Sequence, residues 1–215
     1  MYSISAIQKI VNAERYGAEH ADQAITHLAY DSRKISSPKE SLFFALRGQR
    51  DGHQYLNDAY AKGLRAFVVS ELPEALVQEP GVQLLLVPDV LAALQSLAQY
   101  HRAQFTHPLI GITGSNGKTV VKEWLSTLLD NDKNIYQSPK SYNSQLGVAL
   151  SLWNLTNEYE IALIEAGISE MHEMHKLEAM IRPNIGVFTN IGMAHAEGFA
   201  TKGDKIKEKM KLFEQ

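Results

Sequence analysis

The stretch Gly111-Ile-Thr-Gly-Ser-Asn-Gly-Lys-Thr119 decides the fold of this chain. It begins inside an apolar run, residues 108–113, which predicts a short buried strand. Residues 120–129 follow it with apolar residues three and four apart, which is typical of a helix. A glycine-rich turn between a strand and a helix presents backbone N–H groups to phosphate. The stretch therefore predicts a phosphate-binding loop.

Two side chains at the end of this loop carry the expected chemistry. Lys118 supplies a cation for the outer phosphates of a nucleotide, and Thr119 offers a hydroxyl to a magnesium ion. The common pattern has a glycine five residues before Gly117, but position 112 is Ile, and the glycine lies at Gly111. A chance match on a glycine-rich turn is the alternative, and the flanking strand and helix argue against it.

Length and composition limit the remaining possibilities. A chain of 215 residues suggests one large or two small domains, and 45% hydrophobic and 21% charged residues are ordinary for a globular protein. A net charge of −3 gives no bulk electrostatic basis for binding nucleic acid. The absence of cysteine excludes disulfides, cysteine zinc sites and thiol catalysis. No apolar run approaches the ~20 residues of a membrane span, and we see no signal peptide, so we expect a cytoplasmic protein.

Strands alternate with helices along both halves, which predicts an α/β fold with a parallel sheet in the second half. The turn Thr106-His107-Pro108 is the expected boundary, giving domains 1–105 and 106–215. The strands expected are 41–46, 66–69, 83–87, 108–113, 134–137, 160–164 and 185–189, and the helices are 3–13, 53–62, 90–105, 120–130, 144–154, 173–181 and 203–213. Because so few strands make a small sheet, we expect the chain to be a fragment of a longer protein.

Three polar residues fall where the strands of the second half end. Thr119 follows the first strand, Glu165 closes the strand at 161–164, and His195 lies shortly after the strand that ends at Thr189. Ligands of open parallel sheets lie beyond the carboxyl ends of the strands, so the three could together hold magnesium. Taken singly, Glu165 could be a surface or capping residue, and His195 could be a polar loop residue.

Other motifs favour structural interpretations on spacing alone. His172 and His175 lack the four-residue spacing of a zinc protease, and we expect both to be partly exposed helix residues. Asp31-Ser-Arg33 could be a turn with a salt bridge, and Asp51-Gly-His53 could be a turn that starts a helix. The lysine-rich segment 202–211 predicts a solvated helix face rather than a nucleic-acid patch.

Taken together, these motifs resemble the Mur ligases of peptidoglycan synthesis, which form amide bonds at the expense of ATP. The resemblance rests on Asp31-Ser-Arg33, residues 41–48, Asp51-Gly-His53 and Gly114-Ser-Asn-Gly-Lys-Thr119. It implies a small N-terminal α/β domain that binds a UDP-sugar, followed by an incomplete parallel-sheet domain that binds ATP through the phosphate loop. A third domain of the family is not recognisable in this sequence.

Three further stretches are similar to one branch of the family. Residues 141–150, 164–167 and 189–199 resemble the ligases that add D-alanyl-D-alanine to UDP-N-acetylmuramoyl-tripeptide. The sequence departs from the family at Val120 and Val121, where threonines are common, and at Asn143-Ser144, where two asparagines are common. The first change leaves phosphate binding intact, whereas the second bears on substrate contact. The alternatives are another amino-acid ligase of the family or, for this fragment, a non-catalytic module that binds UDP-sugar and ATP.

The resemblance also implies roles for individual residues. ATP would phosphorylate the terminal carboxylate of the tripeptide, and the amine of the dipeptide would then displace phosphate. Lys209 lies where the family carries a carbamylated lysine, and a plain solvated lysine is the alternative. A fragment lacking the rest of the ligase is expected to be inactive. The implied catalytic residues are Lys118, Glu165, His195 and Lys209; ATP contacts Gly114, Ser115, Asn116, Gly117, Lys118 and Thr119; Mg²⁺ contacts Thr119, Glu165 and His195; the UDP-sugar peptide contacts Ser32, Arg33, Arg47, Gly48, Asp51, His53, Asn143 and Ser144.

Overall fold

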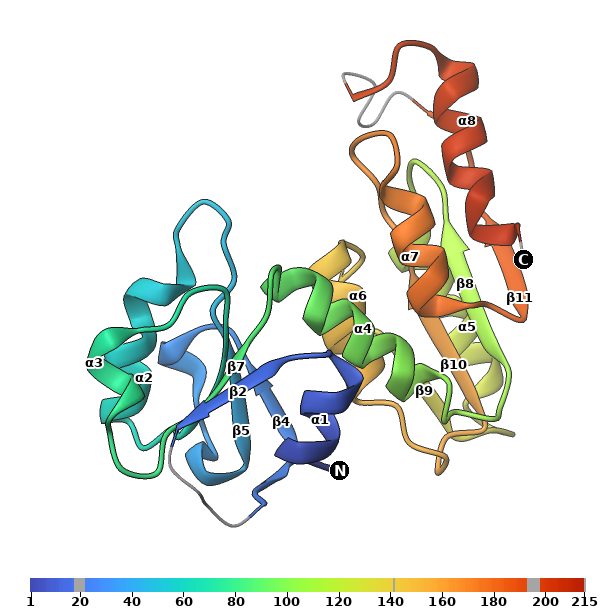
Figure 1. Cartoon of the computed structure of the whole chain (residues 1–215). Helices are drawn as coiled ribbons and strands as arrows, with labels where there is room; N and C mark the ends of the chain where they lie inside the picture. The colour runs from blue at the N-terminus through green and yellow to red at the C-terminus, as the bar shows by residue number, and fades with distance from the viewer. Residues whose placement is uncertain (18–21, 141, 193–197, 215) are drawn as a thin grey trace. The chain divides into compact units, whose positions relative to one another are not determined.

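The chain divides into two compact units, Met1–Leu97 and Ala98–Gln215 (Figure 1). The computed structural model describes residues 1–17, 22–140, 142–192 and 198–214. The division falls inside the helix α4 (Val90–Arg102), upstream of the turn at Thr106 where the sequence places the domain boundary. We describe each unit by itself.

The first unit is built on a five-stranded sheet with the order β2-β7-β6-β5-β4. The strands β4, β5, β6 and β7 run parallel, and β2 pairs antiparallel with β7 at the edge. A separate antiparallel pair joins β1 to β3. The bounds are β1 Tyr2–Ser3, α1 Ile4–Ile10, β2 Glu14–Gly17, β3 Ala24–Ile25, β4 His27–Ala29, β5 Ser41–Phe44, α2 Leu56–Ala61, β6 Ala66–Val69, α3 Glu74–Val77 and β7 Gln83–Leu86.

The central strands of this sheet are buried on both faces. Every residue of β5 and β6 is buried, as the continuous apolar runs in the sequence predict for parallel strands. Phe43 and Phe67 pair across the two strands with their ring centroids 6.2 Å apart, in an edge-to-face arrangement. The polar turns that precede and follow β5 are thereby held on a rigid support.

The second unit contains a four-stranded, fully parallel sheet with the order β11-β8-β10-β9 (Figure 1). The parallel sheet expected from the sequence is therefore confirmed. The bounds are β8 Leu109–Thr113, α5 Lys118–Leu129, β9 Ile135–Gln137, α6 Gln145–Trp153, β10 Ile161–Glu165, α7 Glu173–Ile181, β11 Ile185–Phe188, α8 Lys202–Met210 and the 3₁₀ turn η5 Lys211–Phe213.

Alternate residues of β8 face the two sides of this sheet. Ile110 and Ile112 pack with Val121 and Leu125 of α5 on one side. Gly111 faces the other side, where a Cβ atom on it would press against Pro183 and the Leu212 side chain of η5. In register, Glu165 pairs with Ile112, so β8 and β10 end together. The loop after β8 and the carboxylate that closes β10 consequently lie at the same edge.

Some elements differ from the sequence-based expectation. The short strands β1, β2, β3 and β4 and the one-turn helix α3 were not predicted, because each is only two to four residues long and too short to show a clear period. The prediction of a solvated lysine-rich face on α8 is wrong for Lys205 and Lys209, which are 2% and 1% exposed. His172 and His175 are exposed, and His175 lies on α7 as expected, whereas His172 is the N-cap before that helix and not a helical residue. Over the described ranges, no helix is long and apolar enough to cross a membrane.

Candidate functional site

The loop between β8 and α5 depends on two glycines with positive φ. Gly114 has φ of +143° and Gly117 has φ of +78°, both in the region that side chains disfavour. Gly117 is the N-cap of α5, and the first helical hydrogen bond runs from the Val121 N–H to the Gly117 carbonyl. The N–H groups of the first turn therefore precede the helical ladder and point out of the helix start, where they favour an anion.

Two residues after β11 frame the loop from the neighbouring strand. The Ser115 N–H donates to the Asn190 carbonyl at 2.9 Å, and the Asn116 N–H donates to Asn190 Oδ1 at 3.2 Å. The Thr189 hydroxyl donates to the Asn116 carbonyl at 2.6 Å. Neither Thr189 nor Asn190 was predicted from the sequence to have a role in this loop. Their position at the end of the strand next to β8 was the signal that could have identified them.

Lys118 folds back over the loop. Its Nζ atom donates to the Gly114 carbonyl at 2.9 Å. Burial lowers the pKa of Lys118, the nearby Glu165 carboxylate acts in the opposite direction, and the charge of Lys205 lowers it further. An ammonium group held over a glycine-rich turn is suited to bind the outer phosphates of a nucleotide.

Thr119 and Glu165 are brought together, as the sequence predicts. Glu165 is fully buried, and the Thr119 hydroxyl donates to its Oε2 atom at 3.2 Å. Its Oε1 atom lies 2.9 Å from the Lys122 ammonium but makes no hydrogen bond of good geometry. A hydroxyl and a carboxylate beside a phosphate loop are hard oxygen donors that fit Mg²⁺. His195, the third expected ligand, lies outside the described residues.

Lysines of α8 lie close to this cluster. Lys209 has a pKa lowered to about 8, first by burial and then by the charges of Lys118 and Lys205. The Lys205 Nζ atom donates to the Gly192 carbonyl at 2.8 Å. The structure thus concentrates positive charge where the phosphates of a bound nucleotide would need neutralising.

Asn143 and Ser144 lie at the start of α6, near the end of β10. The Ser144 hydroxyl caps this helix by accepting the Gly147 N–H at 3.2 Å. The Gly167 N–H donates to the Asn143 carbonyl at 2.8 Å, and a Cβ atom on Gly167 would overlap the Asn143 side chain. The Asn143 side chain therefore lies against Gly167, which is two residues after Glu165 in the sequence. The Ser144 hydroxyl is used in capping α6.

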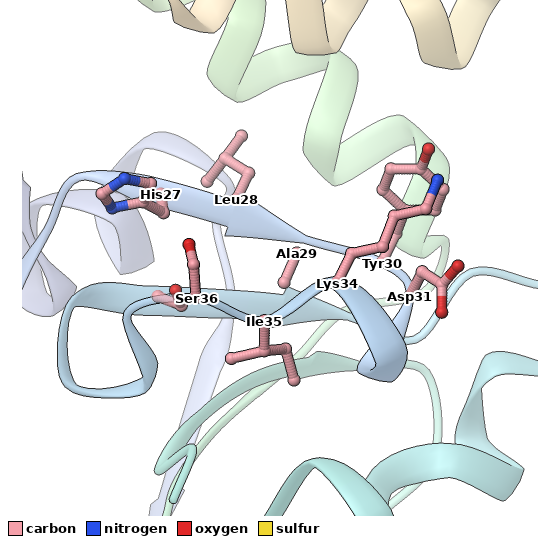
Figure 2. A pocket seen from close by; sticks show the side chains of 9 residues that line it. His27, Leu28, Ala29, Tyr30, Asp31, Lys34, Ile35 and Ser36 are labelled. Atoms are coloured by element: carbon pink, nitrogen blue, oxygen red, sulfur yellow. The ribbon is translucent and has the colours of Figure 1, made fainter. Parts of the chain in front are cut away.

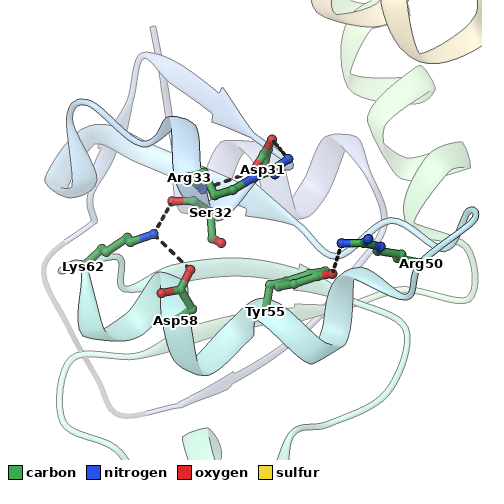
Figure 3. Close-up of polar contacts among 7 residues, drawn as sticks. All are labelled: Asp31, Ser32, Arg33, Arg50, Tyr55, Asp58 and Lys62. Carbon is green, nitrogen blue, oxygen red and sulfur yellow. Dashed lines mark hydrogen bonds and ion pairs between the residues drawn. The ribbon is translucent and has the colours of Figure 1, made fainter.

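In the first unit, the Asp31-Ser-Arg33 turn contains an ion pair (Figure 3). The Arg33 guanidinium donates to both carboxylate oxygens of Asp31, at 2.9 and 2.8 Å. These bonds lower the pKa of Asp31 to about 2. The Lys62 ammonium reaches the Ser32 carbonyl and the Asp58 carboxylate, each at 3.0 Å, and joins the turn to α2. The salt-bridged turn favoured on spacing is therefore present.

The Asp51-Gly-His53 turn is tightly bonded as well. Asp51 accepts the His53 N–H at 2.9 Å and lies 2.6 Å from His53 Nδ1, while His53 Nε2 accepts the Ser70 N–H at 3.0 Å. An accepting Nε2 places the ring proton on Nδ1, toward Asp51. Arg47 contacts Asp51 at 3.4 Å and Glu71 at 2.9 Å. The turn thus begins a 3₁₀ helix, as expected from spacing.

Figure 2 shows a hollow beside the first of these turns. Tyr30, Asp31 and Lys34 gather at one end of the hollow, and His27 lies toward the other. An amine, a phenol and a carboxylate at a hollow are typical of sites for polar ligands. The complete lining is His27, Leu28, Ala29, Tyr30, Asp31, Lys34, Ile35, Ser36 and Ser41.

The strand, glycine loop and helix, with a carboxylate at the end of the neighbouring strand, define the second unit as a phosphate-loop domain of the α/β class. Residues 112–215 match the model of the Mur ligase middle domain. This part of the chain is therefore similar to the middle domain of the Mur ligases.

Known proteins resemble the chain over both units. A UDP-N-acetylmuramoyl-tripeptide–D-alanyl-D-alanine ligase from Rickettsia prowazekii is 36% identical over 175 residues, which are 81% of this chain and 38% of that protein. A crystal structure of MurF from Acinetobacter baumannii aligns with a TM-score of 0.90 at 25% identity, over 99% of this chain and 46% of that one. MurF ligase from Thermotoga maritima, solved in complex with ADP, aligns with a TM-score of 0.78 at 28% identity, over 90% of this chain and 44% of that one. The chain thus spans less than half the length of these relatives.

Proposed function

We propose that this chain supplies the nucleotide-binding and UDP-sugar-binding parts of an ATP-dependent ligase that joins D-alanyl-D-alanine to UDP-N-acetylmuramoyl-tripeptide. One observation carries the proposal: the phosphate loop lies beside the Thr119–Glu165 pair at the edge of a parallel sheet. The names of the relatives support the choice of substrates.

In this proposal the loop binds ATP through its backbone N–H groups and Lys118, and residues 114–119 form the nucleotide contacts. Thr119 and Glu165, together with His195, would hold Mg²⁺. When bound, this ion would supply positive charge to the phosphoryl group as it is transferred. The Thermotoga maritima relative was solved in complex with ADP, which supports an adenine nucleotide as the ligand.

The reaction would proceed in two displacements. The terminal carboxylate of the tripeptide attacks the γ-phosphorus of ATP, the bond to the β-phosphate oxygen breaks, and an acyl phosphate and ADP form. The amine of D-alanyl-D-alanine then attacks the acyl carbon, loses a proton and expels phosphate, leaving an amide. Lys118 would stabilise the charge that builds up on the phosphoryl oxygens in the first step.

Lys209 has the properties that carbamylation requires. A lysine with a pKa of about 8 is partly neutral near physiological pH, and the neutral amine can add to CO₂ with loss of a proton. The product is an anion, which the neighbouring charges of Lys118 and Lys205 would stabilise. A carbamylated Lys209 therefore fits these surroundings better than a third ammonium group.

The UDP-sugar peptide would bind mainly to the first unit. Ser32, Arg33, Arg47, Gly48, Asp51 and His53 are the proposed contacts there, with Asn143 and Ser144 in the second unit. The Arg33 side chain supports this, because it is 80% exposed yet oriented by Asp31. A guanidinium in such a position is suited to bind a diphosphate. A cytoplasmic location, where these precursors are made, remains part of the proposal.

The substrate choice is tested by phosphate release from ATP, using the protein that contains this chain. With UDP-N-acetylmuramoyl-tripeptide present, D-alanyl-D-alanine should drive phosphate release, and single amino acids should not. Release driven by a single amino acid would instead identify another ligase of the family. Binding of both nucleotides without any release would identify a non-catalytic binding module.

A further inference from the structure

Lys122 is a buried lysine for which neither the sequence motifs nor the proposed reaction has a use. It lies on α5, three residues after Thr119 and therefore on the same face of the helix. Its side chain is 2% exposed. Burying an ammonium group is costly unless it is paired and hydrogen-bonded, so its surroundings should explain why it is there.

The Lys122 ammonium lies among three oxygen atoms, two of which accept its hydrogen bonds while the third forms an ion pair with it. It lies 2.9 Å from Glu165 Oε1, donates to the Ser138 carbonyl at 2.6 Å, and donates to the Lys140 carbonyl. Because its side chain is 2% exposed and its ammonium is held among these three oxygens, Lys122 is not available to a substrate or a phosphate. Its role must therefore be exerted through the groups that it contacts.

Glu165 divides its two carboxylate oxygens between two residues of α5. Oε1 faces Lys122, and Oε2 accepts the Thr119 hydroxyl at 3.2 Å. The Glu165 N–H also approaches the Ser138 hydroxyl, at 3.4 Å. The carboxylate is thus fixed on one side by a cation, and its other oxygen is directed toward the start of the helix that follows the phosphate loop.

We propose that Lys122 is the positioning residue of the metal site: by binding Oε1 of Glu165, it holds Oε2 toward Thr119, where a nucleotide-bound Mg²⁺ would meet it. This inference rests on the proposed function. A cation that is buried behind the carboxylate orients it without competing for Oε2. Partners of this kind behind a metal ligand typically change metal affinity by roughly 10- to 100-fold when they are removed.

A purely structural role is the competing explanation. Lys122 also ties the segment after β9 to α5 through the Ser138 and Lys140 carbonyls. Loss of those bonds would lower stability and weaken all nucleotide binding, with or without Mg²⁺. A positioning role predicts something narrower, namely loss of the part of the affinity that Mg²⁺ contributes.

The test is calorimetric titration of the 215-residue chain with ADP, once with Mg²⁺ and once with EDTA. The measured quantity is the Mg²⁺ increment, defined as the metal-free Kd divided by the Kd with Mg²⁺. Lys122→Met should reduce this increment about tenfold or more while leaving the metal-free Kd unchanged. Lys202→Met, at an exposed position of α8, is the matched control and should keep the wild-type increment.

A double-mutant cycle with Glu165→Gln completes the experiment. If Lys122 acts through Glu165, adding Lys122→Met to Glu165→Gln should not reduce the Mg²⁺ increment any further. If Lys122→Met does not fold, Lys122→Gln replaces it in the same cycle. A wild-type increment in the folded Lys122 variant, or equal weakening with and without Mg²⁺, would overturn the inference alone. Absence of any increment in the wild-type chain would overturn the proposed metal site as well.

Discussion

At the scale of single residues, burial strongly lowers the pKa of Lys209. The pKa of this lysine falls from 10.5 to about 8 because the side chain is buried near Lys118 and Lys205. Between these two pH values the unfolded chain binds the proton and the folded chain does not. The free energy of unfolding should therefore rise with pH from 8 to 10.5, and the contribution of Lys209 should be absent once the pH has fallen below about 8.

Lys209→Met removes this titration. Its free energy of unfolding should exceed that of the wild type at pH 7. Between pH 8 and 10.5 the difference between variant and wild type should then decrease by a total on the order of 3 kcal/mol, because only the wild type gains stability there. Urea unfolding in CO₂-free buffer at several pH values measures it. Lys202→Met, an exposed change on the same helix, should follow the wild type. If the Lys209→Met profile also ran parallel to the wild type, Lys209 would not be neutralised on folding.

At the scale of elements, the loop between β8 and α5 depends on close contact with β11. A Cβ atom on Gly114 would overlap the Thr189 hydroxyl, and the φ of +143° there is strained for any other residue. Gly114→Ala should therefore displace the loop, lower the melting temperature by several degrees, and weaken Mg-ADP binding. Thermal unfolding and calorimetry measure the two effects.

The control for this variant is Gly203→Ala, in the first turn of α8. The nearest atom to a Cβ there is the Thr201 hydroxyl oxygen at 3.5 Å, and φ is ordinary. Because alanine favours a helix over glycine, Gly203→Ala should leave the melting temperature equal or slightly raised. Unchanged stability and Mg-ADP affinity in Gly114→Ala would show that the loop does not need its observed conformation.

The elements that could be predicted from the sequence are those with a strong period or an apolar run. The strands β8 and β10 have an apolar run, and the helix α5 has a helical period. The contact between Thr119 and Glu165 could be predicted from the parallel topology alone. The burial of Lys205 and Lys209 could not be predicted in this way. Their helix is lysine-rich in sequence, and only its packing against α7 and η5 shows which lysines turn inward.

Contacts that depend on tertiary structure escaped prediction for the same reason. Asn190 binds loop amides that are about 75 positions away in sequence, and nothing in its local sequence marks that distance as short. Lys122 lies three residues after Thr119 on α5, and a lysine at this spacing is equally common on exposed helix faces. In the first unit, the turns at Asp31 and Asp51 formed as spacing indicated, whereas the contribution of these turns to substrate binding is still a prediction.

At the scale of the whole molecule, the two units are proposed to bind mainly different ligands. UDP-N-acetylmuramoyl-tripeptide should shift the amide NMR signals of Ser32, Arg33, Gly48 and His53 in the 215-residue chain, with or without nucleotide. Arg33→Ala should weaken this binding roughly tenfold, because it removes an oriented guanidinium. The folded variant should keep its affinity for Mg-ADP. Perturbations confined to the second unit would contradict this assignment.

The most direct test of the central claim is the affinity of the chain for Mg-ATP before and after Lys118→Ala. The change removes an ammonium group from the loop, a contact worth about 1.5–3 kcal/mol, and substitutes neither of the two loop glycines. Calorimetry should show a Kd raised roughly 10- to 100-fold in Lys118→Ala and unchanged in the control Lys202→Ala. An equal Kd for the wild type and Lys118→Ala would contradict the assignment of this loop as the nucleotide site.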